Sequence, residues 1–479
     1  MNKFKKLGLL LFIITSAIST CKGQTKKDKP NIIIILADDL GWGDVGFNKS
    51  DISTPNIDKL AREGMLLNHF YTAPICSPTR AGLMTGRYPN RFGLRETVIP
   101  PWSKFGVDTS ETFLPEFLEG AGYKQRVALG KWHLGHASKK YLPLNRGFTH
   151  FYGHYNGAID YFSHKREGEL DWHNDWETSF DKGYSTDLIT DEAVRVINKG
   201  GDEKSPFFLY IAYNAPHSPL QAKMEDLLKN GYDKSKPTFG NDKSEDEFGV
   251  QGRGNNRRQT YSAMVTALDR GVGRIMTSLK EKGIDQNTLI LFFSDNGAAP
   301  NGGGSSGNLR GTKFEEWDGG VRAPAIAKWP NFIKSGSKTD QVMGYVDVVP
   351  TIINIAGGDP ISHQKFDGLD MTNVLTSGHG IIERNLYLGY GSLVNNEWKI
   401  VTANSGNDRM KLKEDAIFDI MKDPSEKNNV KNENPEAYKK LLLILESFES
   451  INPKNLVPPY GEGKKGFKAP KNWIIKNED

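Results

Sequence analysis

The chain has 479 residues, of which 62 are Lys or Arg and 58 are Asp or Glu, so its formal net charge is +4. Charged residues make up 25% and hydrophobic residues 37% of the chain, which is ordinary globular usage and excludes a disordered, collagen-like or coiled-coil protein. Two cysteines cannot form a disulfide framework. The small net charge and the lack of a dense Lys/Arg block argue against a nucleic-acid partner.

The N-terminal segment is typical of a secretory signal. Three lysines within the first six residues precede the apolar run Leu7–Ile14 and a stretch of small residues that ends at Cys21. We expect residues 1–21 to be a signal peptide, with Cys21 either acylated as in a bacterial lipoprotein or close to an ordinary cleavage site, and residues 22–29 to be a tether. The Lys-, Ile- and Asn-rich composition favours a bacterial source. Together with the signal-like segment, it predicts an exported protein, periplasmic or lipid-anchored at the cell envelope.

The apolar run near the N-terminus is too short to span a bilayer. No later segment approaches about 18 consecutive apolar residues, so we expect no transmembrane segment in the mature chain.

Strand-length apolar runs alternate with helical patterns through most of the chain. The expected buried strands are Asn31–Leu36, Pro206–Tyr213 and Thr288–Phe293. The expected helices are Pro55–Glu63, Thr112–Ala121, Ser185–Asn198 and Tyr261–Lys282, and Lys229–Arg258 is expected to be a long surface loop. This alternation predicts a doubly wound α/β domain over residues 30–378.

The pattern changes near residue 378. Short strand-like pieces at Asn385–Tyr390, Trp398–Thr402 and Ala416–Ile420 precede one helical pattern at Pro435–Phe448. That order predicts a smaller α+β domain over residues 379–479.

Acidic pairs follow two of the expected strands. Asp38 and Asp39 come directly after the first strand, and Asp295 and Asn296 follow the strand that ends at Ser294. Because ligands bind beyond the carboxyl ends of parallel strands, both pairs should face one crevice. Three carboxylates and an amide oxygen favour Ca²⁺ or Mg²⁺ over zinc. The alternative is that both pairs cap turns.

The segment Cys76–Arg87 reads Cys-Ser-Pro-Thr-Arg-Ala-Gly-Leu-Met-Thr-Gly-Arg. Ser77 is a good N-cap and Pro78 a favoured first helical residue, so Cys76 should lie just ahead of a helix N-terminus, where an anion is stabilised. From the residues alone, Cys76 is either a nucleophilic thiolate or a buried structural thiol.

This segment resembles the signature of the type I sulfatases, in which the cysteine of Cys-x-Pro-x-Arg is converted to formylglycine (3-oxoalanine). Further motifs of that family are matched by Gly130–Gly135, Ala215–Pro219, Leu309–Lys313 with Gly319–Arg322, and residues 415–430, so the resemblance covers roughly residues 29–450. The sequence departs from the family at two places. Asp318 replaces the usual Glu, which should leave Lys313 unaffected, and one extra residue in Gln125–Leu129 suggests a β-bulge.

The resemblance implies the alkaline-phosphatase-like sulfatase fold, a large mixed, mostly parallel sheet between helices with a small C-terminal α+β domain that holds a short antiparallel sheet. It implies hydrolysis of sulfate esters that depends on Ca²⁺ and formylglycine. The implied metal ligands are Asp38, Asp39, residue 76, Asp295 and Asn296. The implied maturation partner is a formylglycine-generating or sulfatase-maturating enzyme.

Chemical roles follow from the resemblance together with the needs of the reaction. A sulfate ester requires cations around its oxygens, a strong nucleophile and a proton for the leaving alcohol. The hydrated aldehyde of residue 76 would attack sulfur, Arg80 would steady it, and Lys131 and Lys313 would bind sulfate oxygens. His217, assisted by Lys313, would protonate the leaving oxygen. His133 would remove the proton from the remaining hydroxyl, which expels sulfate.

Residues 151–176 hold seven aromatic side chains, which suggests stacking on sugar faces, with core packing as the alternative. The stretch Gly157–His164 resembles the arylsulfatase B-like branch, so Asp160 and His164 are expected to contact substrate beside Lys131, His217 and Lys313. We expect a sulfated poly- or oligosaccharide, first an algal one of the ulvan or carrageenan type, with a glycosaminoglycan N-acetylgalactosamine sulfatase as the alternative. A phosphodiesterase or phosphonate hydrolase of the same superfamily and a non-catalytic sugar-binding module are alternatives of other classes.

Overall fold

The computed structural model describes residues 29–95, 97–240, 247–359, 364–378, 381–451 and 457–476. The expected signal peptide with Cys21, and all of the tether except Lys29, lie outside the described residues. Within the described part of the chain, no helix combines the length and the apolar character needed to cross a bilayer.

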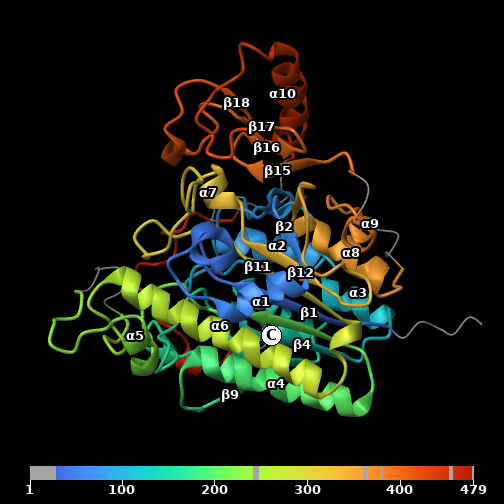
Figure 1. Ribbon diagram of the computed structural model, residues 1–479. Helices are drawn as coiled ribbons and strands as arrows, with labels where there is room; N and C mark the ends of the chain where they lie inside the picture. Colours follow the sequence, from blue (N-terminus) through green and yellow to red (C-terminus); the bar gives the residue numbers. More distant parts are fainter. Residues whose placement is uncertain are drawn as a thin grey trace, which may run out of the picture.

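A ten-stranded mixed sheet forms the centre of the first domain, with the strand order β13-β2-β12-β11-β1-β10-β4-β5-β8-β9 (Figure 1). The central neighbours β11, β1, β10, β4 and β5 are all parallel, and the outer pairs are antiparallel except β13 with β2. The strands of this sheet are β1 (Asn31–Ala37), β2 (Met65–Leu67), β4 (Gln125–Lys131), β5 (His150–His154), β8 (His173–Asn174), β9 (Glu177–Thr178), β10 (Phe207–Ala212), β11 (Thr288–Ser294), β12 (Ala325–Lys328) and β13 (Ser337–Thr339). Two small ribbons pair β3 (Phe70–Tyr71) with β14 (Met343–Gly344) and β6 (Lys165–Arg166) with β7 (Glu169–Leu170).

Helices cover both faces of the sheet, which explains why β1 is apolar at nearly every position. Ile32 and Ile34 join one core, and Ile33 and Ile35 join the other. The first core is covered by α2 (Cys76–Thr85), α3 (Leu114–Gly120), α8 (Val348–Ile355) and α9 (Thr372–Ser377). The second is covered by α1 (Pro55–Glu63), α4 (Ser185–Glu203), α5 (Met224–Lys229) and α6 (Arg257–Glu281), and Figure 1 shows α4 and α6 side by side. The predicted fold class is therefore confirmed.

Two local expectations are wrong. Cys76 is the first residue of α2, with Ile75 at the N-cap, because the Ser77 hydroxyl donates to the carbonyl of His133 instead of capping the helix. The expected bulge in the strand before Gly130 is absent, since β4 pairs with β10 and β5 in an unbroken register.

The second domain lies at the top of Figure 1 and is built on a four-stranded antiparallel sheet. Its elements are β15 (Asn385–Gly389), β16 (Ser392–Asn395), β17 (Trp398–Val401), β18 (Ala416–Asp419) and α10 (Pro435–Glu449). The strand β16 was missed from the sequence. Leu386 and Leu393 of this sheet pack in one core with Tyr71, Tyr88 and Tyr345 of the first domain, so the two domains share a hydrophobic interface.

A buried ion-pair triad also joins the two domains. Lys399 on β17 lies 2.7 Å from Asp318 and 2.7 Å from Glu426. Asp318 belongs to α7 (Asp318–Val321), which follows the Lys313 loop, and its amide donates to the Glu426 carboxylate at 2.7 Å. Burial raises the pKa of Glu426 to about 7, against the attraction of Lys399. Lys399 therefore forms ion pairs with two carboxylates at the interface between the domains.

The last described segment, residues 457–476, returns to the first domain, and we call it the C-terminal strap. Trp473 is buried in the core of the first domain, and its indole N–H donates to the carbonyl of Arg166 at 3.0 Å. Nearer the start of the strap, the Tyr460 carbonyl accepts from the indole of Trp102 at 2.7 Å. The strap thus packs on the first domain, whereas the sequence had placed it with the second.

Replacing Lys399 by Met tests the triad. The Lys399→Met variant should lose roughly 3–5 kcal/mol of unfolding free energy, because Glu426 keeps no ion pair and Asp318 keeps only Arg322, at 3.4 Å. Denaturant unfolding followed by tryptophan fluorescence measures this loss. The control is Lys422→Met, which removes a 2.7 Å pair to Asp419 from a lysine that is 85% exposed and should change little. Equal stability of the two variants would contradict the interpretation.

Candidate active site

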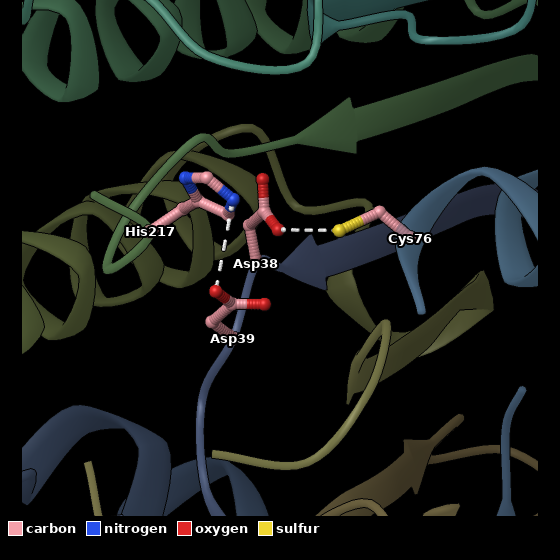
Figure 2. A group of neighbouring side chains, drawn as sticks. All are labelled: Asp38, Asp39, Cys76 and His217. Carbon is pink, nitrogen blue, oxygen red and sulfur yellow. Dashed lines mark hydrogen bonds and ion pairs between the residues drawn. The ribbon is translucent and has the colours of Figure 1, made fainter. Parts of the chain in front are cut away.

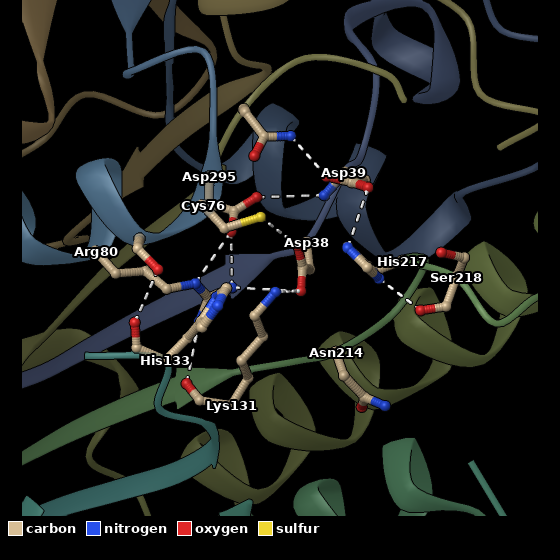
Figure 3. A network of polar contacts seen from close by, with 12 residues as sticks. Asp38, Asp39, Cys76, Arg80, Lys131, His133, Asn214, His217, Ser218 and Asp295 are labelled. Atoms are coloured by element: carbon tan, nitrogen blue, oxygen red, sulfur yellow. Dashed lines mark hydrogen bonds and ion pairs between the residues drawn. The ribbon is translucent and has the colours of Figure 1, made fainter. Parts of the chain in front are cut away.

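The predicted site residues meet at the carboxyl edge of the parallel strands. Asp38 and Asp39 follow β1, and Asp295 and Asn296 follow β11. His133 follows β4 and His217 lies in the loop after β10, while Cys76 begins α2 and faces them (Figure 3). This is the edge at which ligands bind in open α/β sheets.

The backbone at this edge is held in uncommon conformations. Asp39 and His133 have φ angles of 65° and 59°, in the left-handed region that non-glycine residues seldom adopt. Hydrogen bonds between neighbouring loops hold these turns, since the amide of Asp38 donates to Ala215 at 3.1 Å and that of Asp295 to Ala37 at 2.9 Å. Such strain costs about 1 kcal/mol or more per residue and is concentrated at functional sites.

Three buried carboxylates pair with three buried cations around Cys76. Asp38 accepts a hydrogen bond from Lys131, Asp39 accepts from Lys313 at 2.6 Å, and Asp295 accepts from Arg80 at 2.8 Å. Arg80 also donates to the carbonyl of Lys131 at 3.0 Å and lies 3.6 Å from Asp38, so the pairs form one network (Figure 3). These six groups are nearly charge-neutral in sum, which is how ions are tolerated at such depth.

The Cys76 sulfur lies inside this network. Its Sγ is 3.4 Å from an oxygen of Asp38 and 3.3 Å from the ammonium of Lys313, and the residue is 2% exposed (Figure 2). Burial, with the carboxylates of Asp295 and Asp38, raises the pKa of the thiol well above its usual value, against the attraction of Lys131 and Lys313. The surroundings thus disfavour the thiolate that was one interpretation of the sequence.

The oxygen donors of the site fit a hard cation. Ligand atoms of Asp38, Asp39, Cys76 and His217 all lie within 4.8 Å of one another (Figure 2). Asn296 donates from its amide nitrogen to Asp39 at 2.7 Å and to Gly297 at 2.9 Å. Its amide oxygen is buried without a partner among the described residues. A buried acceptor of this kind, beside carboxylates, is what Ca²⁺ or Mg²⁺ would satisfy.

Burial lowers the pKa of both histidines of the site. Burial, together with Lys131 and Arg80, lowers the pKa of His133 far below its usual value, and its Nδ1 has no partner in the described part of the chain. Burial lowers the pKa of His217 to about 3, against the attraction of Asp39, whose carboxylate lies 3.7 Å from Nε2. Its other nitrogen, Nδ1, contacts the carbonyl of Ser218 (Figure 3).

Three residues that contact His133 or His217 were not predicted from the sequence to do so. Gly157 packs directly on His133, since an added Cβ would lie 2.5 Å from the imidazole ring. Ser77 donates to the carbonyl of His133 at 3.0 Å, and the Tyr161 hydroxyl donates to the carbonyl of His217 at 2.8 Å. All three residues lie in stretches whose family resemblance was noted, Cys76–Arg87 and Gly157–His164, but the sequence alone gave no sign of these contacts.

The expected sugar-stacking aromatics are mostly core residues instead. Phe151, Tyr155 and Trp172 are buried, whereas Trp176 is exposed. The other residues of the set are likewise buried or half-buried, namely Tyr152, Tyr161 and Phe162. This segment closes the second core and the edge of the sheet, which is the alternative that the sequence left open.

Asp160 and His164 are placed away from the predicted site residues. Asp160 is buried and accepts hydrogen bonds from the amides of Ser163 at 2.7 Å and Gly249 at 2.9 Å. His164 stacks on Trp172 with ring centres 4.6 Å apart. Neither residue lines the cavity above Cys76.

A cavity of about 760 Å³ opens above the network. Its floor is lined by Cys76, His133, His217 and Lys313. Its walls come from three parts of the chain and are lined by Ile99, Trp102 and Arg166 of the first domain, by Tyr390, Asn407 and Arg409 of the second, and by Tyr460 and Lys464 of the C-terminal strap.

Comparison with known proteins identifies the class. The family model described as Sulfatase matches residues 30–358, so the chain belongs to the sulfatase family and is a sulfuric ester hydrolase. The chain is 34% identical to mouse (Mus musculus) N-acetylgalactosamine-6-sulfatase over 407 residues, which cover 80% of this chain and 72% of the relative. It is 31% identical to mouse arylsulfatase J over 493 residues, which cover 91% of this chain and 78% of that relative.

Among solved structures, the chain is similar to Ps i-CgsB in complex with k-i-k-neocarrahexaose, with a TM-score of 0.79 and 32% identity over 91% of this chain and 96% of that one. The family expected from the Cys76 signature is therefore confirmed, together with its fold.

The contact between Gly157 and His133 gives a direct test. A methyl group at residue 157 should turn the imidazole, so Gly157→Ala should lower sulfatase kcat by roughly 100-fold with little change in KM. Steady-state kinetics measures both. The control is Gly120→Ala, at a position with nothing within 4 Å of the added carbon. Unchanged kcat in a folded Gly157→Ala protein would show that the ring position does not matter.

Proposed function

We propose that this sulfatase depends on Ca²⁺ and on a formylglycine made from Cys76, and that it removes sulfate esters from a sulfated carbohydrate. The observation that carries the proposal is the position of Cys76 at the start of α2, with its sulfur between Asp38 and Lys313 on the floor of the cavity. A nucleophile formed there would meet the substrate beside both a group of carboxylates that could hold a metal ion and the ammonium of Lys313.

Asp38, Asp39, Asp295, Asn296 and residue 76 would hold Ca²⁺. When bound, Ca²⁺ supplies charge stabilisation for the sulfate oxygens and for the nucleophile. The orphaned oxygen of Asn296 supports this assignment, because an amide oxygen beside carboxylates is a ligand that Ca²⁺ prefers. Arg80 would keep Asp295 and Asp38 in place through its contacts at 2.8 and 3.6 Å.

Formylglycine would supply a geminal diol as nucleophile, formed by a maturation enzyme acting on the segment that begins at Cys76. Lys313, on the cavity floor, would turn from Asp39 to the sulfate oxygens by rotation of its flexible side chain. Lys131, which is buried against Asp38 and does not line the cavity, would attract the sulfate through its charge. His217, at the cavity floor, would donate a proton to the leaving sugar oxygen once the negative charge of the bound sulfate ester has raised its pKa. His133, with its Nδ1 without a partner in the described chain, would take the proton from the diol.

For the substrate we propose a sulfated galactan oligosaccharide of the carrageenan type. The structure of Ps i-CgsB with a neocarrahexaose, which matches nearly the whole described chain, supports this class. The similarity to N-acetylgalactosamine-6-sulfatase supports the second candidate, a 6-sulfated N-acetylgalactosamine in a glycosaminoglycan. Ulvan stays a prediction, and Asp160 and His164 no longer support contacts to sugar, because they do not line the cavity.

We also propose that the chain is exported. The charged, apolar and small-residue pattern of residues 1–21 supports a signal peptide, with Cys21 as the residue that would carry a lipid. A sulfated polysaccharide is too large to enter a cell intact, so an envelope location suits the proposed substrate.

The test is a desulfation screen of protein produced with a maturation enzyme. Neocarra-oligosaccharides, ulvan oligosaccharides and chondroitin 6-sulfate oligosaccharides are incubated with the enzyme, and released sulfate is measured by ion chromatography. We expect release from the carrageenan oligosaccharides, lost on the order of 10⁴-fold or more in Cys76→Ala. Chelation of Ca²⁺ should abolish release, and added Ca²⁺ should restore it.

Three outcomes would contradict the proposal. Release only from chondroitin 6-sulfate would favour the glycosaminoglycan substrate. Faster cleavage of a phosphodiester than of every sulfate ester would favour the phosphodiesterase class. Full activity of Cys76→Ala would exclude formylglycine at this position.

A further inference from the structure

Four cationic side chains line the cavity beyond the groups on its floor: Arg95, Arg166, Arg409 and Lys464. Two of them are neutralised by carboxylates. Arg95 pairs with Glu449 at 2.6 Å, and Arg166 pairs with Glu247 at 3.0 Å. A cation that already has a counterion gains little from a second anion, so these two are poor binding groups for a charged ligand.

Lys464 on the C-terminal strap differs from these two. Its ammonium lies 5.0 Å from the ring centre of Trp102, and no ion pair to it occurs within the described ranges of the chain. The acid Glu167, which also lines the cavity, pairs with Arg166 at 3.7 Å and acts on Lys464 only as a longer-range attraction. The strap is anchored here, because the Trp102 indole donates to the Tyr460 carbonyl at 2.7 Å.

Arg409 presents the same arrangement from the second domain. Its guanidinium lies 4.6 Å from the ring centre of Phe314, and it too forms no ion pair with any residue that the structure describes. The same ring lies 5.5 Å from the ammonium of Lys313, so Arg409 flanks the reacting centre across one aromatic side chain. Burial raises the pKa of Glu316, which also lines the cavity, to about 8, against a hydrogen bond from Asn407 and the charges of Lys399 and Arg95. Near neutral pH that carboxyl therefore carries no full charge.

Each cation is thus held by the face of an aromatic ring and keeps its hydrogen-bond donors for a ligand. A cation–π contact positions such a group without neutralising it. Low-dielectric walls around a cavity lined by uncompensated positive charge also concentrate anions. The floor already accounts for one sulfate group, so Lys464 and Arg409 are available for others.

We propose that Lys464 and Arg409 form two anion subsites that flank the reacting sulfate and bind further sulfate esters on neighbouring sugar units. The enzyme then prefers a multiply sulfated oligosaccharide over a singly sulfated one. This inference rests on the proposed function, since it takes the floor of the cavity as the place of the ester that is hydrolysed. It assigns a recognition role to the C-terminal strap and to the turn Asp408–Met410 of the second domain.

The test compares two substrates in four variants. The substrates are a carrageenan-type hexasaccharide sulfated on several units and a monosaccharide with one sulfate. Lys464→Met and Arg409→Met should each lower kcat/KM for the hexasaccharide by roughly tenfold, mainly through KM, because each removes a charge-assisted contact. Both should leave kcat/KM for the monosaccharide within about twofold.

The matched controls are Lys465→Met, one residue along the strap, and Lys413→Met, close to Arg409 in sequence. Both lysines are exposed and do not line the cavity, so neither substitution should change the preference. Equal losses on both substrates in the Lys464 and Arg409 variants, or no loss on either, would overturn the inference.

A binding experiment separates this inference from the proposed function. Calorimetric titration of the hexasaccharide into Cys76→Ala needs neither maturation nor turnover. Lys464→Met or Arg409→Met in that background should weaken binding by roughly the same factor of ten. Unchanged affinity would reject the subsites even if the enzyme is an active carbohydrate sulfatase. Weakened affinity without desulfation by the mature enzyme would reject the proposed function alone.

Discussion

The arrangement on which the structure depends is the network of three buried carboxylates and three buried cations around Cys76. Asp38, Asp39 and Asp295 belong to strand ends, whereas Arg80 comes from α2, Lys131 from β4 and Lys313 from the loop before α7. Removing so many charges from water is costly, and the cost is offset only while every partner is in position. The apolar strands that place these residues are therefore as important to the site as the charged groups themselves. Lys131 and Lys313 neutralise Asp38 and Asp39 in this network.

Both domains and the C-terminal strap line the cavity above this network. The first domain supplies the floor, the second domain one wall, and the C-terminal strap another. Lys399 fixes the second domain through Asp318 and Glu426, and Trp473 fixes the strap. Because Asp318 lies in the helix that follows the Lys313 loop, the joint between the domains is also close in sequence to a group on the cavity floor. Changes in either wall can thus alter substrate preference while the floor stays the same, as expected for a family whose members act on different sulfate esters.

Much of this could be predicted from the sequence. The β-branched run at β1, the helical pattern of α1 and the acidic pairs at two strand ends follow local rules, and the structure has them where they were expected. The start of the helix that holds Cys76 was misplaced by two residues, because the Ser77 hydroxyl donates to the carbonyl of His133 and does not cap its own helix. The aromatic segment was ambiguous, since composition does not distinguish a ring such as Trp172 in a core from one that stacks on sugar. The C-terminal strap has no periodic pattern, and only tertiary contacts such as Trp473 with Arg166 reveal where it packs.

The account depends most directly on the chemical state of residue 76. Its decisive measurement is peptide mass spectrometry of this residue in preparations that contain different amounts of maturation enzyme, with sulfatase activity determined on the same samples. The account predicts that the peptide beginning near Cys76 loses its thiol and gains an aldehyde, and that activity rises in proportion to the converted fraction and extrapolates to zero with none. Full activity in a preparation whose residue 76 is entirely unmodified cysteine would contradict it.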